Sequence, residues 1–279
     1  MTLIIILIAL VLDRTISRNA HLYSICYTSG YAKWLTEKRM FSASTKVIAL
    51  ALAIILPVLM THLLTSSLSG VLLFLLECVI LFVGVRHATL PHHYHAYRAA
   101  LTRNDAEACY LYAGKILPAT PANNSEAINR AMGRELAYLN YQYYAAVIIW
   151  YAAFGATGVV LYVLLRDWKK LAKKNNKLPV KQLETCAEWL DYVPARIASA
   201  IYLFIGDFTR ALPTWLKYLT NVSVSARHVI THIATKATAD NEVMEGAISN
   251  PASYVDLSKR TVKTLVVIVA FLTILGLVE

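Results

Sequence analysis

The sequence predicts an all-α fold: a polytopic membrane protein with four to five transmembrane helices, plus amphipathic helices at the interface and on the cytoplasmic side. The 279 residues are 57% hydrophobic and only 16% charged, which is outside the usual range of soluble domains. Several apolar runs approach the roughly 20 residues of helix that cross a bilayer. No stretch alternates apolar and polar residues long enough to predict a sheet.

The N-terminal region, residues 1–85, is expected to contain a short helix and a transmembrane hairpin. Residues 2–12 are apolar but end at Asp13, which leaves only about 17 Å of helix, so this segment spans only if Arg14 and Arg18 reach the headgroups. It lacks the basic start and cleavage site of a signal peptide, so we interpret it as a retained short or tilted helix. Apolar runs at 47–64 and 68–85 are separated by a few small polar residues, which predicts a tight antiparallel hairpin.

Glu77 lies near the middle of the second run of this hairpin. An ionised carboxylate is costly at that depth and is usually paired or faces water. Two interpretations stay open. Glu77 contacts a ligand, a proton or an ion inside the bundle, or it is a protonated or hydrogen-bonded carboxyl group that fixes helix packing.

Residues 86–142 are expected to form a helical loop region in the cytoplasm. The loop 13–46 carries six Lys and Arg against two acids, and the hairpin returns the chain to that same side. Asn104 is expected to cap a helix, with Glu107 as the third helical residue. Another helix is expected to begin at Ser125 and to run toward the membrane.

A histidine-rich stretch, RHATLPHHYHAYR, occupies residues 86–98. His92 and His95 are three positions apart and would share a helix face, a spacing that suits metal coordination, with His93 as a third ring nearby. The alternative is that these histidines form hydrogen bonds at the membrane surface.

Residues 143–165 are predicted to be the central transmembrane helix, preceded by tyrosines that we interpret as a membrane-interface belt, namely Tyr138, Tyr141, Tyr143 and Tyr144. Seven Lys and Arg follow at 166–181, where a complete crossing would place them outside. Either the chain re-enters around Phe154 to Gly158, or the basic and amphipathic region 166–260 faces outward against the positive-inside rule. The lysines are expected to contact anionic lipid, and no nucleic-acid recognition module is visible.

The stretch WLDYVPARIASAIYLFIG, residues 189–206, places Pro194 before an apolar run. Proline is expected to end one helix and to begin another. Arg196 would then lie in the first turn, where it could pair with Asp191 or bind an anion through its forked guanidinium. The apolar run is only about nine residues, so we expect it to lie in the interface. Residues 261–279 are predicted to form the C-terminal transmembrane helix.

Motifs for common cofactors are absent from the sequence. There is no phosphate-binding loop, no H-E-x-x-H, no G-x-S-x-G and no glycine-rich dinucleotide loop. The four cysteines show no C-x-x-C spacing, which gives no sign of a zinc site or a disulfide framework. We therefore expect no cofactor.

Several segments together resemble the AmpE family of bacterial inner-membrane proteins over essentially the whole chain. They are PHHYHAYRAALTRNDAEA, RELAYLNYQYYAAVIIW, EWLDYVPARIASAIYLFIGDFTRALPTW and the apolar C-terminus. The most specific parts are residues 191–197 and 211–215. The family in turn resembles the CobD/CbiB membrane enzymes of cobalamin synthesis, whose W-x-P-A-R-L feature is similar to the residues around Pro194 and Arg196. The acidic motifs of those enzymes are replaced here by LNYQYYAA, with Gln142, and by RTISRNAHLYS.

The resemblance implies a multi-pass protein of the bacterial inner membrane that modulates β-lactamase induction through cell-wall recycling signals, without catalysis. An anionic cell-wall-derived ligand would contact Arg196, Asp191, His95 and Arg98, with Glu77 as a further candidate. Membrane lipid is the other expected partner, and nucleic acid is not expected. Two alternatives stay open: a membrane enzyme of the adenosylcobinamide-phosphate synthase type, and a structural protein that docks a membrane partner.

Overall fold

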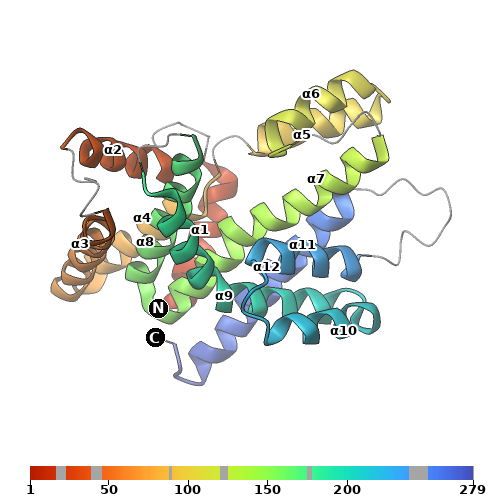
Figure 1. Cartoon of the computed structure of the whole chain (residues 1–279). Coiled ribbons are helices and arrows are strands. Elements are labelled where there is room, and N and C mark those ends of the chain that lie inside the picture. Colours follow the sequence, from red (N-terminus) through yellow and green to blue (C-terminus); the bar gives the residue numbers. More distant parts are fainter. Residues whose placement is uncertain are drawn as a thin grey trace. The chain divides into compact units, whose positions relative to one another are not determined.

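A computed structural model describes residues 1–16, 23–38, 46–87, 90–119, 125–174, 178–238 and 251–278. Every regular element in these ranges is a helix (Figure 1), which confirms the predicted all-α class. In chain order the elements are α1 (Thr2–Thr15), α2 (Ser24–Glu37), α3 (Lys46–Ser67), α4 (Gly70–Val85), α5 (Leu90–Thr102), α6 (Ala106–Ile116), α7 (Ser125–Asn140), the π-helix η2 (Tyr141–Ala145), α8 (Ala146–Lys174), α9 (Val180–Ile205), α10 (Phe208–Leu219), α11 (Ala226–Ala237) and α12 (Pro251–Ile274).

Two helical stretches within the described residues are long and apolar enough to cross a bilayer. They are Val47–Ser67 and Ser125–Lys173. The apolar helix α4 has 16 residues and α1 has 14, so both are shorter than the roughly 20 residues of a typical span. Helix α12 has 24 residues but carries three charged side chains in its first half and a fourth directly after it, namely Asp256, Lys259, Arg260 and Lys263. The predicted count of four to five spans is therefore not confirmed.

The chain divides into two compact units. Unit 1 comprises Met1–Arg86, Tyr143–Pro194 and Leu265–Glu279, and unit 2 comprises His87–Gln142 and Ala195–Thr264. Two of the four boundaries between the units fall at unusual backbone: one inside η2 and one directly after the proline within α9.

In unit 1, α8 is the central helix, because α2, α3 and α4 all pack against it and α1 packs against α4. Trp168 of α8 is fully buried among apolar side chains of α2, α3 and α9, and its indole nitrogen donates to the carbonyl oxygen of Thr28. The predicted hairpin exists as the helices α3 and α4. The two helices do not pack tightly on each other, however, because each uses its packing face for α8.

Gly155 interrupts α8 with non-helical dihedrals, φ 60° and ψ −151°. The backbone reverses there, because a Cβ atom added to Gly158 would lie 2.5 Å from the carbonyl oxygen of Trp150. In one continuous helix, residues eight positions apart are about 12 Å apart along the axis. Residues 143–165 are therefore two helical limbs that meet at Gly155, and the prediction of one central helix is wrong. The reversal lies inside the Phe154 to Gly158 segment that the sequence offered for re-entry.

In unit 2, α5 and α6 form a helical hairpin (Figure 1), α6 packs on α7, and α11 packs on both α7 and α10. Close approach of α7 and α12 depends on Gly133, where an added Cβ atom would lie 2.5 Å from the ring of Tyr254. Asp105, and not Asn104, caps α6, with its carboxylate accepting from the Ala108 amide at 2.9 Å. Asn104 instead takes a left-handed φ of 53°, which asparagine tolerates and which reverses the chain between α5 and α6.

Helix α9 continues through Pro194, so the predicted break at this residue is wrong. Proline inside a helix removes one backbone hydrogen bond, and its ring crowds the carbonyl of the preceding turn. Helix α9 accommodates both effects without ending. Pro194 and Ala195 are both buried, whereas Val193 is exposed.

Candidate functional site

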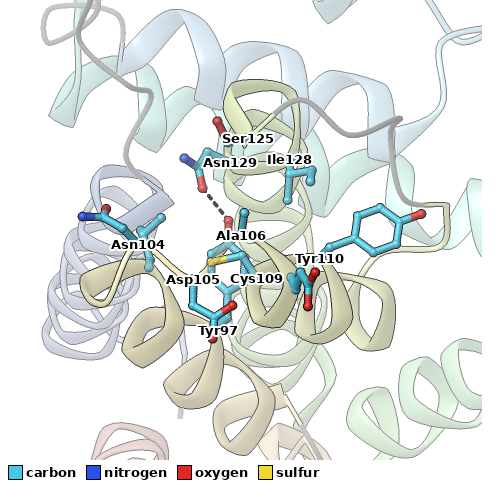
Figure 2. Close-up of a pocket in the computed structure, with 11 residues that line it drawn as sticks. Tyr97, Asn104, Asp105, Ala106, Cys109, Tyr110, Ser125, Ile128 and Asn129 are labelled. Carbon is cyan, nitrogen blue, oxygen red and sulfur yellow. Dashed lines mark hydrogen bonds between the residues drawn. The ribbon is translucent and has the colours of Figure 1, made fainter.

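A cavity of about 870 Å³ lies in unit 2 and is lined by residues of α5, α6 and α7. Small-molecule sites typically have volumes of roughly 300–1,000 Å³, so the cavity is large enough for a ligand. Figure 2 shows the residues that line it: Tyr97, Leu101, Asn104, Asp105, Ala106, Glu107, Cys109, Tyr110, Ser125, Ile128 and Asn129.

Asn129 is the polar residue that the fold holds most firmly in this wall. Asn129 is only 2% exposed. Its Oδ1 accepts a hydrogen bond from the Tyr97 hydroxyl (Figure 2). That bond fixes which way the amide faces. Tyr97 is the partner that the described residues give the Asn129 amide oxygen, and Asn129 also lines the cavity.

The charge of the cavity wall comes from Asp105 and Glu107, and none of its described lining residues is Lys or Arg. Asp105 uses one carboxylate oxygen to cap α6, which leaves the other oxygen for a donor group. Tyr110 presents a partly exposed ring beside them. The wall therefore combines carboxylate acceptors, a fixed amide donor and an aromatic face.

The Cys109 thiol also lines the cavity. Burial raises its pKa above the ordinary thiol value, and the nearby Asp105 carboxylate raises it further. Burial also raises the pKa of the Tyr97 phenol strongly, so this hydroxyl keeps its proton and remains a donor to Asn129. The thiol is therefore a weak nucleophile at neutral pH.

Arg196, the leading candidate from the sequence, is 6% exposed. Its Nη2 donates to the carbonyl oxygens of Asn221 at 2.9 Å and of Tyr218 at 3.4 Å. These carbonyls lie at the end of α10 and in the turn that follows it. The described contacts thus give Arg196 a role in holding this turn, while its predicted contact with an anion stays a prediction.

Asp191 is buried in unit 1, where it accepts from the Tyr162 hydroxyl at 3.1 Å. Its predicted pairing with Arg196 stays a prediction, since the two residues fall in different units. Glu77 accepts from the Tyr151 hydroxyl at 3.0 Å. Its other oxygen would lie 3.7 Å from a Cβ atom added to Gly155. Glu77 therefore holds α4 against the reversal in α8, which fits the interpretation that it fixes helix packing.

His92, His95 and Arg98 are exposed on α5. Within the described ranges, no group of three or more His, Cys, Asp or Glu side chains could hold a metal. His92 and His95 thus have no third ligand of these kinds in the described part of the chain. Arg98 is a neighbour of Tyr97 in sequence, yet it is not among the residues that line the cavity.

A buried polar cluster in unit 1 was not predicted from the sequence. Arg166 is buried and donates to Asp167, to the Gly84 carbonyl and to the Ser24 hydroxyl, each at 3.0 Å. Its guanidinium carbon lies 4.0 Å from the centre of the Tyr143 ring. Arg166 begins the basic run 166–181, whose lysines were expected to contact anionic lipid, and its buried guanidinium joins three helices of unit 1.

The predicted tyrosine belt is also different in the structure. Tyr138, Tyr141 and Tyr143 are buried, and Tyr144 donates to Asp13 at 2.7 Å. Arg227 lies over the Tyr138 ring, 4.3 Å from its centre, while pairing with Glu135. These tyrosines therefore contact cations and carboxylates inside the protein. Their spacing in the sequence could not distinguish such buried tyrosines from a membrane-interface belt.

Comparison with known proteins agrees with the resemblance found in the sequence. The family described as "Regulatory signalling modulator protein AmpE" matches residues 1–278. The protein named "Protein AmpE" from Shigella flexneri is 31% identical over 232 residues, which cover 77% of this chain and 80% of that protein. No solved structure matches the chain significantly. The relation to the CobD/CbiB enzymes stays a prediction. Because the family match covers nearly every residue, the chain belongs to the AmpE family of regulatory signalling modulators.

Proposed function

We propose that this chain is a multi-pass inner-membrane protein that modulates β-lactamase induction by binding a small product of cell-wall turnover in the cavity of unit 2. The observation that carries the proposal is Asn129, a buried amide that Tyr97 orients and that lines a cavity of about 870 Å³. The family's signalling role supports the regulatory part. The ligand and the output are our proposals.

The lining residues favour an uncharged ligand over the anionic one that the resemblance implies. Two carboxylates without a neighbouring lysine or arginine in the described wall repel an anion and accept from O–H and N–H groups. Asn129 would donate to one carbonyl or hydroxyl oxygen. A hydroxyl-bearing or amide-bearing fragment meets all of these requirements.

The membrane arrangement that we propose uses the reversal at Gly155. The limb Tyr143–Phe154 has about 12 residues and a length of about 17 Å, roughly half of a 30 Å bilayer core. The chain would dip into the membrane and return to the side from which it came. Residues 86–142 and the basic run 166–181 would then share the cytoplasmic side, in agreement with the positive-inside rule. Helix α3 would make one complete crossing, and the 16-residue helix α4 would return as a short span.

The experiment measures inducible β-lactamase activity in a host that lacks this gene, with and without a sub-inhibitory β-lactam. Complementation with the wild-type gene is expected to restore the induction profile. An unchanged profile in the deletion host would contradict the signalling role. Turnover of cobinamide by the purified protein would then be the assay that tests the enzymatic alternative.

A further inference from the structure

Two histidines of α11 and one tyrosine of α10 meet in unit 2, in a group that we call the Tyr–His–His cluster: Tyr218, His228 and His232. The Tyr218 hydroxyl lies 3.1 Å from His228 Nε2 and 2.8 Å from His232 Nδ1. The two imidazole centroids are 5.4 Å apart. His228 and His232 are four positions apart on one helix, so both rings leave the same face of α11.

These distances are close to those of a metal site with three protein ligands. Zinc bonds of about 2.0–2.1 Å to nitrogen or oxygen in a tetrahedron place neighbouring ligand atoms about 3.3 Å apart. The two oxygen-to-nitrogen distances in the cluster are slightly shorter than this value. Small side-chain rotations would therefore open a place for one ion, with its fourth position left for water.

The backbone around the cluster is fixed by hydrogen bonds that do not use the three donor groups. The buried Arg196 guanidinium donates to the carbonyl oxygens of Tyr218 and Asn221. The Asn221 side chain in turn accepts from the amide and hydroxyl of Ser223, at 3.0 and 2.7 Å. The turn between α10 and α11 is thus held in place, which preorganises ligands that come from both helices.

Arg134 and Lys236 are cationic neighbours of His232. They weaken the binding of any cation, so the site favours ions that bond strongly to imidazole.

We propose that the Tyr–His–His cluster binds one borderline transition-metal ion of the zinc type, which links α10 to α11. Nitrogen lone pairs of both imidazoles and the Tyr218 oxygen form the bonds, and the phenol proton leaves to solvent. This site is separate from the cavity that contains Asn129, and its existence does not depend on the proposed signalling role.

The test uses the full-length chain in detergent micelles, purified without a histidine tag and stripped of metal with a chelator. Co²⁺ is titrated as a spectroscopic probe, and Zn²⁺ is then added in competition. We expect tetrahedral Co²⁺ absorption that saturates at one ion per chain and that Zn²⁺ abolishes. His232→Gln and His228→Gln should each weaken binding at least about tenfold, and Tyr218→Phe should change the spectrum by removing the oxygen ligand.

The matched control is the double variant His92→Gln/His95→Gln, which removes the exposed histidine pair of α5 and should leave the titration unchanged. Circular dichroism of every variant checks that the helices persist. Absence of tetrahedral Co²⁺ absorption in the wild-type protein would overturn the proposal. Equal binding by wild type and His232→Gln, or loss of binding in the α5 double variant, would overturn it as well.

Discussion

The Arg166 guanidinium lies over the Tyr143 ring, 4.0 Å from its centre, although the two residues are far apart in the sequence. Lys170 reaches the same tyrosine and donates to its hydroxyl at 2.9 Å. In a single straight helix, the separation of Tyr143 from Arg166 would be about 35 Å. The contact between Tyr143 and Arg166 therefore follows from the reversal of the chain at Gly155. It joins the two ends of the helical hairpin that this reversal forms.

The reversal predicts that Gly155→Ala destabilises the protein. The dihedrals of Gly155 belong to a region that essentially only glycine occupies, so a side chain there costs on the order of 1–3 kcal/mol. Thermal unfolding in micelles measures the effect. Gly30→Ala is the matched control, because Gly30 lies inside α2 with nothing within 4 Å of an added Cβ and alanine should stabilise a helix interior by about 0.5–1 kcal/mol. Equal melting temperatures for the two variants would argue against a required glycine.

The proposed membrane arrangement predicts that positions on both sides of the hairpin face the same compartment. Single cysteines at Arg103 and Lys181, in a chain whose four native cysteines are replaced, should both react with a membrane-impermeant maleimide in inverted vesicles and not in intact cells. Ser67→Cys, at the turn between α3 and α4, should show the opposite pattern. Labelling of positions 103 and 181 from opposite sides would mean that 143–165 crosses the bilayer.

Arg196→Ala is expected to reduce stability. The variant removes charged hydrogen bonds to the carbonyls of Asn221 and Tyr218, at a cost on the order of 2–3 kcal/mol. Arg103→Ala is the control, because Arg103 is exposed and surface changes usually fall within about 0.5 kcal/mol. Chemical unfolding in micelles distinguishes the two roles of Arg196. Unchanged stability with lost β-lactamase regulation would favour the anion contact predicted from the sequence.

Cys109 is expected to react with iodoacetamide more slowly than the exposed Cys186 at the same pH. Burial and Asp105 raise the Cys109 thiol pKa, and only the thiolate is nucleophilic. The rise of its alkylation rate with pH should therefore be displaced to higher pH than that of an ordinary thiol. Rates are measured on two proteins that each retain one of these cysteines. A Cys109 profile at or below the ordinary thiol range would contradict the burial of this side chain.

Local patterns in the sequence predicted the helical class and the positions of α3 and α4, because apolar runs and turn residues are short-range signals. They also named Phe154 to Gly158 as one place for re-entry. They failed at Pro194, because α9 continues through this proline as one helix and local sequence does not report which prolines a helix accommodates. The partners of Arg166 are distributed over α2, α4 and α8, and no local pattern reports such long-range contacts.

The candidate site was harder to predict than the fold. Asn129 becomes a candidate only because the fold buries it and brings Tyr97 to its oxygen, two facts that the sequence does not contain. The spacing of His228 and His232 in the sequence was a signal of the same kind as the spacing of His92 and His95. Their third donor, Tyr218, is contributed by another helix, so only the structure brings the three together.

The central claim is that the cavity of unit 2 senses a ligand through Asn129, and Asn129→Asp tests it most directly. The carboxylate keeps the shape and an acceptor for Tyr97 but removes both N–H donors. Arg130→Gln is the control, on the same helix but exposed. In the β-lactamase induction assay, at matched protein levels and melting temperatures, we expect Arg130→Gln to complement the deletion and Asn129→Asp to fail. Full complementation by Asn129→Asp would contradict the claim.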